Sequence, residues 1–436
     1  MVSRVILLII ALSMNTGCDK SNKNKPLPGK HINLMQEIIY AKPDEALKNK
    51  EIIIPTAQVN HQWLSSNFDL NSVPQNIKIE TPLSYQISRH SLLKANSMLT
   101  STITPVIAEG VLYLADSRGN VAAYNTKNFS KPLWYKMALN KADIYDQVGG
   151  GLKLVQNTLV VTFGGKTIVA LDKTSGEEIW TYNLSNIARS APEIKNNLVY
   201  VLTIDNRLYC LNLHNGFVVW THEGAVEQFS VFGSASPVTT EHLVIVPHSS
   251  GQLLALNAKT GESVWQLNLI KNVNNNTMLY LNDIDMTPVI NQNTIYLSNY
   301  TGVMFAIDIT TGHIKWTNDS VGGSKFIWIA GDYIYSVNNY QQLTAVLKQT
   351  GQVKWVQNIE DGTPKSKKDK LVLAGPIMIN NILYFTSVDG MLIAFESTTG
   401  KKIYEYKIDK AVYSPPIAVE RNIYFINNTG VLSVIW

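Results

Sequence analysis

A recurring aromatic residue constrains the fold of this chain more than any other feature. Six of these residues follow a glycine by four positions, and the spacing between neighbours is 39 to 51 residues. A repeat of this length is typical of solenoids and propellers, because one such unit cannot bury its apolar faces alone. The aromatic positions are Tyr85, Trp134, Trp180, Trp220, Trp265, Trp316, Trp355 and Tyr404.

Each interval contains short apolar runs bounded by turn residues. Between Trp180 and Trp220, for example, such runs occupy 198–202 and 208–211, with Asp205-Asn206 between them. Runs of about five apolar residues bounded by Asn, Asp and Gly predict strands joined by hairpins. One interval has room for four strands, so we predict an all-β fold, an eight-bladed β-propeller of four-stranded antiparallel blades.

The two ends of the chain predict how the ring closes. The segment from Pro416 to Trp436 contains only three predicted strands, and the strand around Tyr85 has no blade of its own. N- and C-terminal strands that share the last blade would leave no open end to the array. We expect the repeated Trp and Tyr residues to be packing anchors between blades, each with a backbone partner for its polar edge. A stacking set for a carbohydrate or a cofactor is the alternative.

The N-terminus reads as an export signal. Arg4 is followed by an apolar run at 5–12, and Thr16-Gly17 places small residues before Cys18. This arrangement resembles a lipobox, in which the cysteine is acylated, although Asn15 stands where an apolar residue is usual. We predict a signal peptide at 1–17, a lipid-attached tether and N-terminal arm at 18–58, and the propeller at 59–436. An ordinary cleaved signal, which releases a soluble periplasmic protein, is the alternative.

Composition and charge exclude several classes of function. The net charge is +4 and the lysines are scattered, whereas nucleic-acid binding needs a concentrated basic face. The eight histidines show no metal-ligand spacing, and no nucleophile or phosphate-binding motif occurs. Cys210 lies in an apolar run, which indicates a small buried side chain. We therefore expect a non-catalytic binding scaffold with no cofactor, no metal and no nucleic-acid partner.

The repeat also carries a family resemblance. The segment from Leu253 to Trp265, with its Thr260-Gly261 turn, resembles the tryptophan-docking repeat that pyrroloquinoline-quinone dehydrogenases share with BamB-type outer-membrane protein assembly lipoproteins. Both families imply an eight-bladed propeller over residues 50 to 436. The dehydrogenases further imply a quinone over the axis, a calcium ion and commonly a disulfide between adjacent cysteines, and this chain has no Cys-Cys pair.

Two segments resemble the BamB-type family in particular. Residues 281–288 are similar to its loop with two aspartates, which implies that Asp283 and Asp285 contact the periplasmic POTRA domains of the barrel insertase. Residues 229–233 are similar to its companion loop, which implies contacts by Phe229, Val231 and Phe232, with Phe232 in place of an arginine. The alternatives are that the apolar residues pack inward and that an aspartate caps its own turn.

The resemblance implies a lipid-anchored scaffold on the periplasmic face of the outer membrane. It would bind a BamA-like insertase through its POTRA domains, assist insertion of outer-membrane proteins, and offer blade edges to unfolded client strands. A periplasmic pyrroloquinoline-quinone-dependent dehydrogenase is the alternative from another class. A propeller that binds a polysaccharide or a different envelope protein also fits the repeat.

Overall fold

The computed structural model describes ten stretches of the chain: 40–67, 70, 73–80, 87–92, 103–140, 148–225, 235–269, 283–359, 371–408 and 410–436. Contacts between residues divide the chain into two units, 1–39 and 40–436, and every described residue belongs to the second. The predicted lipidation site Cys18, the aromatic residue Tyr85 and the predicted contact residues Phe229, Val231 and Phe232 lie outside the described residues.

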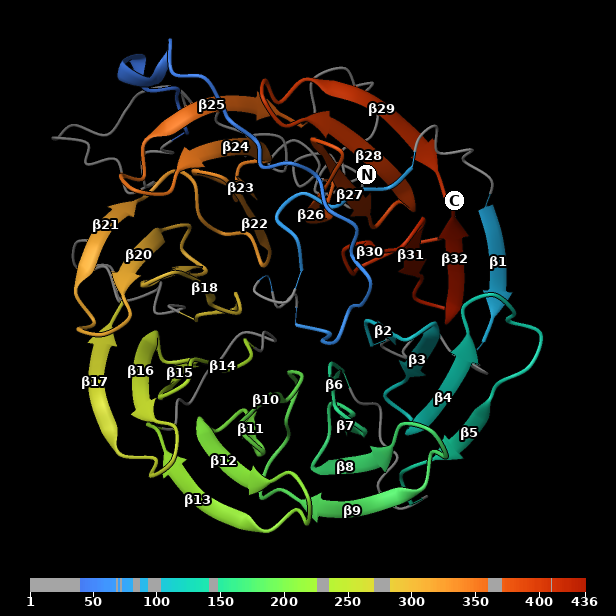
Figure 1. Cartoon of the computed structure of the whole chain (residues 1–436). Helices are drawn as coiled ribbons and strands as arrows, with labels where there is room; N and C mark the ends of the chain where they lie inside the picture. Colours follow the sequence, from blue (N-terminus) through green and yellow to red (C-terminus); the bar gives the residue numbers. More distant parts are fainter. Residues whose placement is uncertain are drawn as a thin grey trace, which may run out of the picture. The chain divides into compact units, whose positions relative to one another are not determined.

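Within the described residues, thirty-two strands form eight four-stranded antiparallel sheets, the blades, which surround a common axis (Figure 1). Blade 1 consists of β2 (Val106–Ala108), β3 (Val111–Ala115), β4 (Asn120–Asn125) and β5 (Trp134–Met137), and blade 2 of β6 (Gly151–Val155), β7 (Thr158–Thr162), β8 (Thr167–Asp172) and β9 (Glu178–Asn183). Blade 3 consists of β10 (Glu193–Lys195), β11 (Leu198–Leu202), β12 (Arg207–Asn212) and β13 (Val218–Glu223), and blade 4 of β14 (Val238–Thr239), β15 (Leu243–Pro247), β16 (Gln252–Asn257) and β17 (Ser263–Asn268).

Blades 5 to 8 follow the same order from the axis outward. Blade 5 consists of β18 (Val289–Asn291), β19 (Thr294–Ser298), β20 (Met304–Asp308) and β21 (Ile314–Asn318), and blade 6 of β22 (Ile327–Ala330), β23 (Tyr333–Val337), β24 (Gln342–Leu347) and β25 (Val353–Asn358). Blade 7 consists of β26 (Leu373–Ile379), β27 (Ile382–Ser387), β28 (Met391–Glu396) and β29 (Lys402–Lys407), and blade 8 of β30 (Ile417–Val419), β31 (Asn422–Ile426), β32 (Val431–Ile435) and β1 (Ile87–Ser91).

The ring closes through strands from both ends of the propeller. β1 pairs antiparallel with β32, in a register that matches Ile87 with Ile435 and Ser91 with Val431. β1 therefore supplies the outer strand of the blade whose other strands come from the C-terminus (Figure 1). This confirms the predicted eight-bladed, four-stranded architecture and the shared last blade.

The strands differ in burial from the inside of a blade to its outside. β8 is buried at five of its six positions, because sheets on both sides cover it, whereas β9 alternates toward solvent. This is why the middle strands read as continuous apolar runs in the sequence.

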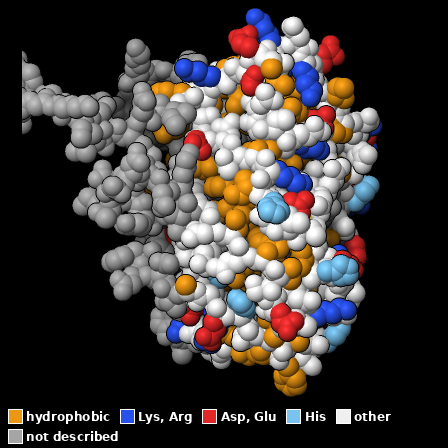
Figure 2. All heavy atoms as spheres, turned by 90° about the vertical axis from the view of Figure 1, so that its left-hand side faces the viewer, with side chains coloured by type: hydrophobic (Ala, Val, Ile, Leu, Met, Phe, Trp, Pro, Cys, Tyr) orange, Lys and Arg blue, Asp and Glu red, His pale blue; other side chains and the backbone are white. Residues whose placement is uncertain are grey.

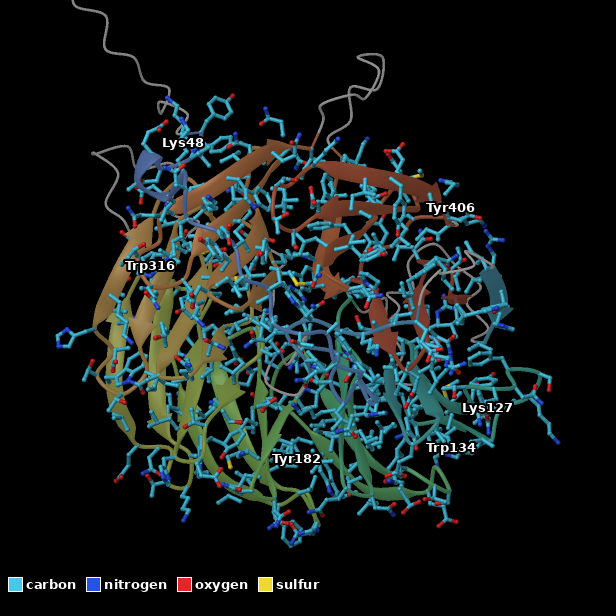
Figure 3. All side chains as sticks on the ribbon, turned by 45° about the horizontal axis from the view of Figure 1, so that its top comes forward. Lys48, Lys127, Trp134, Tyr182, Trp316 and Tyr406 are labelled. Atoms are coloured by element: carbon cyan, nitrogen blue, oxygen red, sulfur yellow. The ribbon has the colours of Figure 1, made fainter. Side chains whose placement is uncertain are left out.

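The repeated tryptophans join each blade to the next at the rim. The Trp180 indole Nε1 donates a hydrogen bond to the Leu213 carbonyl of blade 3, at 2.7 Å. Its ring lies over Gly216, whose φ is +72°, and a Cβ added there would lie 2.7 Å from the ring. The same pair recurs around the ring, including Trp134 and Trp316, which lie near the rim (Figure 3). For the six tryptophans this confirms the predicted role as inter-blade packing anchors.

The described residues between 40 and 80 form a strap that crosses the axis of the ring (Figure 1). It begins with a short 3-10 helix, η1 (Glu45–Leu47), beside β25. Further along, single bridges join Trp63 to Ile107 of blade 1, Ser65 to Lys153 of blade 2 and Ile77 to Ile379 of blade 7. The strap thus satisfies backbone groups that the inner strands would otherwise leave unpaired at the axis.

Candidate partner-binding site

The two predicted contact loops connect neighbouring blades. Residues 229–232 precede β14 in the sequence, and Asp283 and Asp285 precede β18. Residues 229–232 lie outside the described residues, and the connection that carries Asp283 and Asp285 runs from the outer strand of blade 4 to the inner strand of blade 5. The structure describes the second loop from Asp283 onward.

Asp283 is an interior residue. Its exposure is 2%, and its backbone carbonyl accepts a hydrogen bond from the Tyr300 amide at 2.9 Å. Tyr300 follows β19 of the same blade, so this bond ties the incoming loop to the turn between β19 and β20. A side chain this deeply buried holds the loop in place more readily than it reaches a partner.

Asp285 has a different environment. Its side chain is 12% exposed, and Oδ2 lies 4.0 Å from Nζ of Lys325, whose own side chain is 58% exposed. Lys325 belongs to the next connection, the one that enters blade 6. Burial raises the pKa of the Asp285 carboxyl, and the Lys325 ammonium opposes this shift only in part.

A cavity of about 270 Å³ lies beside Asp285; we call it the axial-mouth cavity. Its wall includes residues that precede the inner strands of blades 2 to 6, which surround the axis (Figure 1). The strap contributes Asn67, whose side-chain oxygen accepts a 2.7 Å hydrogen bond from the Ser236 hydroxyl. Ser236 also donates to the Ala191 carbonyl at 3.1 Å, so the strap, blade 3 and blade 4 are joined at this cavity.

The backbone beside the cavity has a conformation and a close packing that require glycine at position 150. Gly150 has φ +99°, and a Cβ there would lie 2.4 Å from the Thr162 carbonyl oxygen. The Gly150 amide donates to the Arg189 carbonyl at 2.6 Å. The glycine-rich segment 149–151 therefore brings blades 2 and 3 together, and this close approach shapes one wall of the cavity.

A second cavity, of about 240 Å³, lies between the strap and the inner strands of blades 2 to 5. Two ionic side chains face each other here, since Lys153 Nζ lies 3.1 Å from Glu193 Oε2 and both side chains are largely buried. Thr239 donates a further hydrogen bond to Glu193 at 2.9 Å. The pair is satisfied within the ring, which indicates a structural role.

His248 is a buried polar residue directly after β15 of blade 4. Its exposure is 0%, and neither ring nitrogen has a hydrogen-bond partner within the described part of the chain. The ring packs against Gly224, where a Cβ would lie 2.3 Å from Cε1. Burial, assisted by the charge of His222, lowers the pKa of His248 to about 4, so the imidazole is neutral at pH 7.

The described residues contain no group of three or more His, Cys, Asp or Glu side chains arranged to hold a metal ion. Cys210 is buried, as its apolar run predicted, and burial raises the pKa of its thiol to about 12. In the same part of the chain, no helix has the length and apolar character needed to cross a membrane.

Sequence reasoning found Asp285 but missed its surroundings. Lys325 and Asn67 carry no motif, and they meet Ser236 only because the ring brings distant connections to one end of the axis. The repeat could have predicted this grouping, because the residues just before every inner strand lie at the same end of the axis. Lys325 stands two positions before β22.

A family model described as "Outer membrane protein assembly factor BamB" matches residues 130–357. Among curated proteins, an uncharacterized protein of Rickettsia conorii is 31% identical over 347 residues, which cover 76% of this chain and 83% of the relative. The outer membrane protein assembly factor BamB of Shewanella oneidensis is 21% identical over 346 residues, covering 77% of this chain and 84% of that protein.

Two solved structures show the same fold. The crystal structure of BamB from Moraxella catarrhalis matches with a TM-score of 0.66 at 20% identity, covering 80% of this chain and 99% of that one. Quinohemoprotein alcohol dehydrogenase from Comamonas testosteroni matches with a TM-score of 0.65 at 12% identity, covering 87% and 81%. Because both identities are low, the structural likeness establishes the eight-bladed propeller and does not choose between the two functions.

Proposed function

Since the chain belongs to the family of the outer membrane protein assembly factor BamB, we propose that it is a non-catalytic scaffold of the barrel assembly machinery that binds the POTRA domains of the barrel insertase. One observation carries the proposed site: Asp285, in the segment that resembles the family's contact loop, borders the axial-mouth cavity with a weakly compensated carboxylate. The partner would approach the end of the ring where the connections between blades 3, 4 and 5 lie.

Two loops would form the proposed contact. Asp285 would supply the charged part, and Phe229, Val231 and Phe232 the apolar part. Aromatic side chains at the centre of an interface contribute a large share of binding free energy, whereas charged groups set orientation and specificity. Asp283 would hold the second loop in the conformation that the partner meets.

The strap supports a scaffold rather than the dehydrogenase alternative. A quinone dehydrogenase needs a planar cofactor over the axis of the propeller. In this chain Trp63 and Ser65 bridge the inner strands of blades 1 and 2 at that axis, and Ile77 bridges blade 7. Reconstitution with pyrroloquinoline quinone and calcium tests the alternative, because bound cofactor absorbance would favour the dehydrogenase and its absence would favour the scaffold.

We propose that Cys18 carries the lipid anchor and that the protein resides on the periplasmic face of the outer membrane. The family supports an outer-membrane assembly role, and the signal-like N-terminus supports the anchor. Two or more acyl chains hold a protein on a bilayer stably, whereas one chain does so only weakly. Cell fractionation of Cys18→Ser tests this, since the variant should move from the membrane pellet to the soluble periplasmic fraction.

The outer strands offer a further contact, with unfolded client strands. Each outer strand has one edge without a partner strand in the described part of the chain. Figure 2 shows that hydrophobic side chains lie among charged ones on the rim, where Val264 and Ile314 are exposed. A client segment in extended form could add to such an edge. Slower amide exchange in β17 or β21 on addition of client peptide would support this role, and unchanged exchange would refute it.

Capture of the insertase from native membranes tests the central proposal. The wild-type chain should recover the insertase, and the double substitution of Asp285→Arg with Phe229→Glu should lose it. Asp332→Arg is the matched control, because Asp332 is exposed at the opposite end of blade 6 and should leave recovery unchanged. Circular dichroism establishes that all variants fold. Equal recovery by the double variant would move the site elsewhere, and no recovery by the wild type would refute the proposed function.

A further inference from the structure

The last blade differs from the other seven in the origin of its outer strand. Seven outer strands follow the third strand of their own blade, whereas β1 comes from the other end of the propeller. We propose that the outer position of blade 8 is an exchangeable strand site, where β1 leaves β32 and an extended segment of another protein, with apolar residues at alternate positions, takes its place. This inference rests on the proposed function, because that function supplies the segment, a strand of an unfolded outer-membrane protein.

β1 lacks the aromatic residue that fastens the other outer strands. In blade 2, Trp180 pairs with Ala170, and its indole binds a carbonyl of blade 3. An aromatic residue has this register position in each of blades 1 to 7. Val434 is the equivalent of Ala170, since each is the fourth residue of the third strand of its blade. The residue that pairs with Val434 is Ser88, so β1 has a short polar side chain where the other blades have their anchor.

The side chains of β1 contribute little apolar contact. The strand Ile87–Ser91 has one apolar residue, at its first position, and the other four are polar. On one face, the Arg89 guanidinium donates a hydrogen bond from Nε to the Ile408 carbonyl of blade 7, at 3.2 Å. After the strand, the Leu92 carbonyl accepts a bond from the Tyr124 hydroxyl of blade 1, at 2.9 Å. β1 is thus held mainly by hydrogen bonds, which another extended strand can replace.

Exchange of the strand conserves the backbone hydrogen bonds of blade 8. β1 pairs with β32 over five residues, and an incoming strand can form the same ladder, so side-chain contacts decide which strand is bound. The ring centroid of His90 lies 4.6 Å from that of Phe129 in blade 1. At the place of His90, an apolar or aromatic side chain would bury more apolar surface against Phe129. Strands of outer-membrane barrels alternate apolar and polar residues, so they supply such a side chain.

The strap keeps blades 8 and 1 together at the axis when β1 leaves the rim. The Asn60 side chain donates to the Ala418 carbonyl of β30 at 2.8 Å, and the Asn60 carbonyl accepts from the Glu420 amide at 2.7 Å. Further along the strap, two backbone hydrogen bonds of 2.7 Å join Trp63 to Ile107 of blade 1. Because the strap joins the same two blades that β1 joins, exchange of the outer strand does not require the propeller to open.

Amide hydrogen exchange of the full chain in detergent tests whether β1 opens. β9 is the matched comparison, because it is an outer strand with a tryptophan anchor. The amides of β1 that bond to β32 should exchange at least about tenfold faster than those of β9 that bond to β8. Equal protection of the two strands would overturn the inference, whether or not the chain binds the insertase.

A disulfide between β1 and β32 tests the exchange itself. Arg89 pairs with Ser433, and paired residues of antiparallel strands have Cα atoms within disulfide range. The variant Arg89→Cys with Ser433→Cys therefore fixes β1 when oxidised. The probe is a fluorescent peptide with the sequence of residues 85–94. It should bind the wild type and the reduced variant, and should bind the oxidised variant at least about tenfold more weakly, because the site is then occupied.

A disulfide in blade 6 is the matched control. Thr344 and Val356 pair at the same register position, so Thr344→Cys with Val356→Cys locks an outer strand that is not expected to exchange. This lock should leave peptide binding unchanged. Mass spectrometry establishes that each disulfide has formed, and circular dichroism that both variants fold. A peptide that carries His90→Phe should bind about threefold more tightly than the unchanged peptide, because of its contact with Phe129.

Two results of the peptide titration would overturn the inference. Equal binding to the oxidised and reduced forms of the blade 8 variant would mean that the peptide binds elsewhere on the chain. No binding to the wild type would mean that β1 does not exchange. The oxidised blade 8 variant should recover the insertase from native membranes as well as the wild type does, so either result leaves the proposed function standing, and loss of insertase recovery by the wild type would refute that function separately.

Discussion

Polar side chains are hydrogen-bonded at the rim of the ring, whereas some are incompletely paired around the axial-mouth cavity. At the rim, each tryptophan N–H meets a carbonyl of the next blade and each ring covers a glycine, as Trp265 does with Ile309 and Gly312. At the loop end of the ring, Asp285 has one distant counterion and His248 has no hydrogen-bond partner among described residues. The repeated contacts at the rim are satisfied and stabilise the ring, whereas Asp285 and His248 are incompletely paired at the end of the ring where we propose that a partner binds.

Removal of a rim anchor should have the largest effect on stability. Trp180 is buried, and its indole fills the contact between blades 2 and 3. Trp180→Ala should lower the free energy of unfolding by about 3–5 kcal/mol, measured by urea denaturation. The exposed Trp436 is the control, and Trp436→Ala should change stability little. Equal losses in the two variants would contradict the anchoring role of the rim tryptophans.

Acidification should destabilise the ring through His248, whose pKa falls from 6.5 to about 4 on folding. Between these values the unfolded chain binds a proton that the folded chain does not, so the free energy of unfolding falls as the pH falls from 6.5 to 4. The full contribution is about 3 kcal/mol.

The His248 contribution is measured by denaturation at pH 7 and pH 5. His248→Leu should reduce the difference between the two pH values, because the buried titratable group is gone. His214→Leu, which changes an exposed histidine, should leave the difference as in the wild type. If His248→Leu retained the full pH dependence, His248 would not be its source.

The strap contact at the axial mouth should have a moderate effect. Asn67→Ala removes the hydrogen bond from Ser236 and leaves that buried hydroxyl with the Ala191 carbonyl alone. We expect a loss of about 1 kcal/mol in the free energy of unfolding. Thermal melts of the variant and of Asn128→Ala, at an exposed turn, compare the two. Equal melting temperatures for the two variants would show that the contact between Asn67 and Ser236 does not stabilise the ring.

An exposed ion pair at the rim should have the smallest effect. Lys402 and Glu405 lie 2.9 Å apart on β29. Because solvent screens such pairs, Lys402→Ala should change the free energy of unfolding by less than about 0.5 kcal/mol, and added salt should remove the difference. A larger, salt-insensitive loss would mean that rim charges contribute to the ring as the tryptophans do.

The regular part of the fold was predictable because each blade repeats one pattern. The glycine four residues before five of the rim tryptophans and before Tyr404 adopts positive φ beneath the tryptophan ring of the preceding blade, so the sequence marks the contact directly. Counting strands predicted ring closure by a strand around Tyr85, and the closing strand is β1, at Ile87–Ser91.

The axial mouth was not predictable in the same way. Asn67, Ser236 and Lys325 are separated by long stretches of sequence and meet only when the ring has closed. The sequence presented Asp283 and Asp285 as equivalents, yet one is buried in the loop and the other borders a cavity. The burial of each aspartate depends on the connections between neighbouring blades, and the sequence of one loop does not show how those connections pack.

Site-specific photo-crosslinking in cells can locate the surface at which the insertase binds. A photoreactive phenylalanine analogue replaces Phe326, which lines the axial-mouth cavity, or Tyr406, which is exposed on the outer strand of blade 7 (Figure 3). We expect a crosslink to the barrel insertase from position 326 and none from position 406. A crosslink from 406 alone, or from neither position while the insertase co-purifies with the chain, would contradict the placement of the partner at the axial mouth.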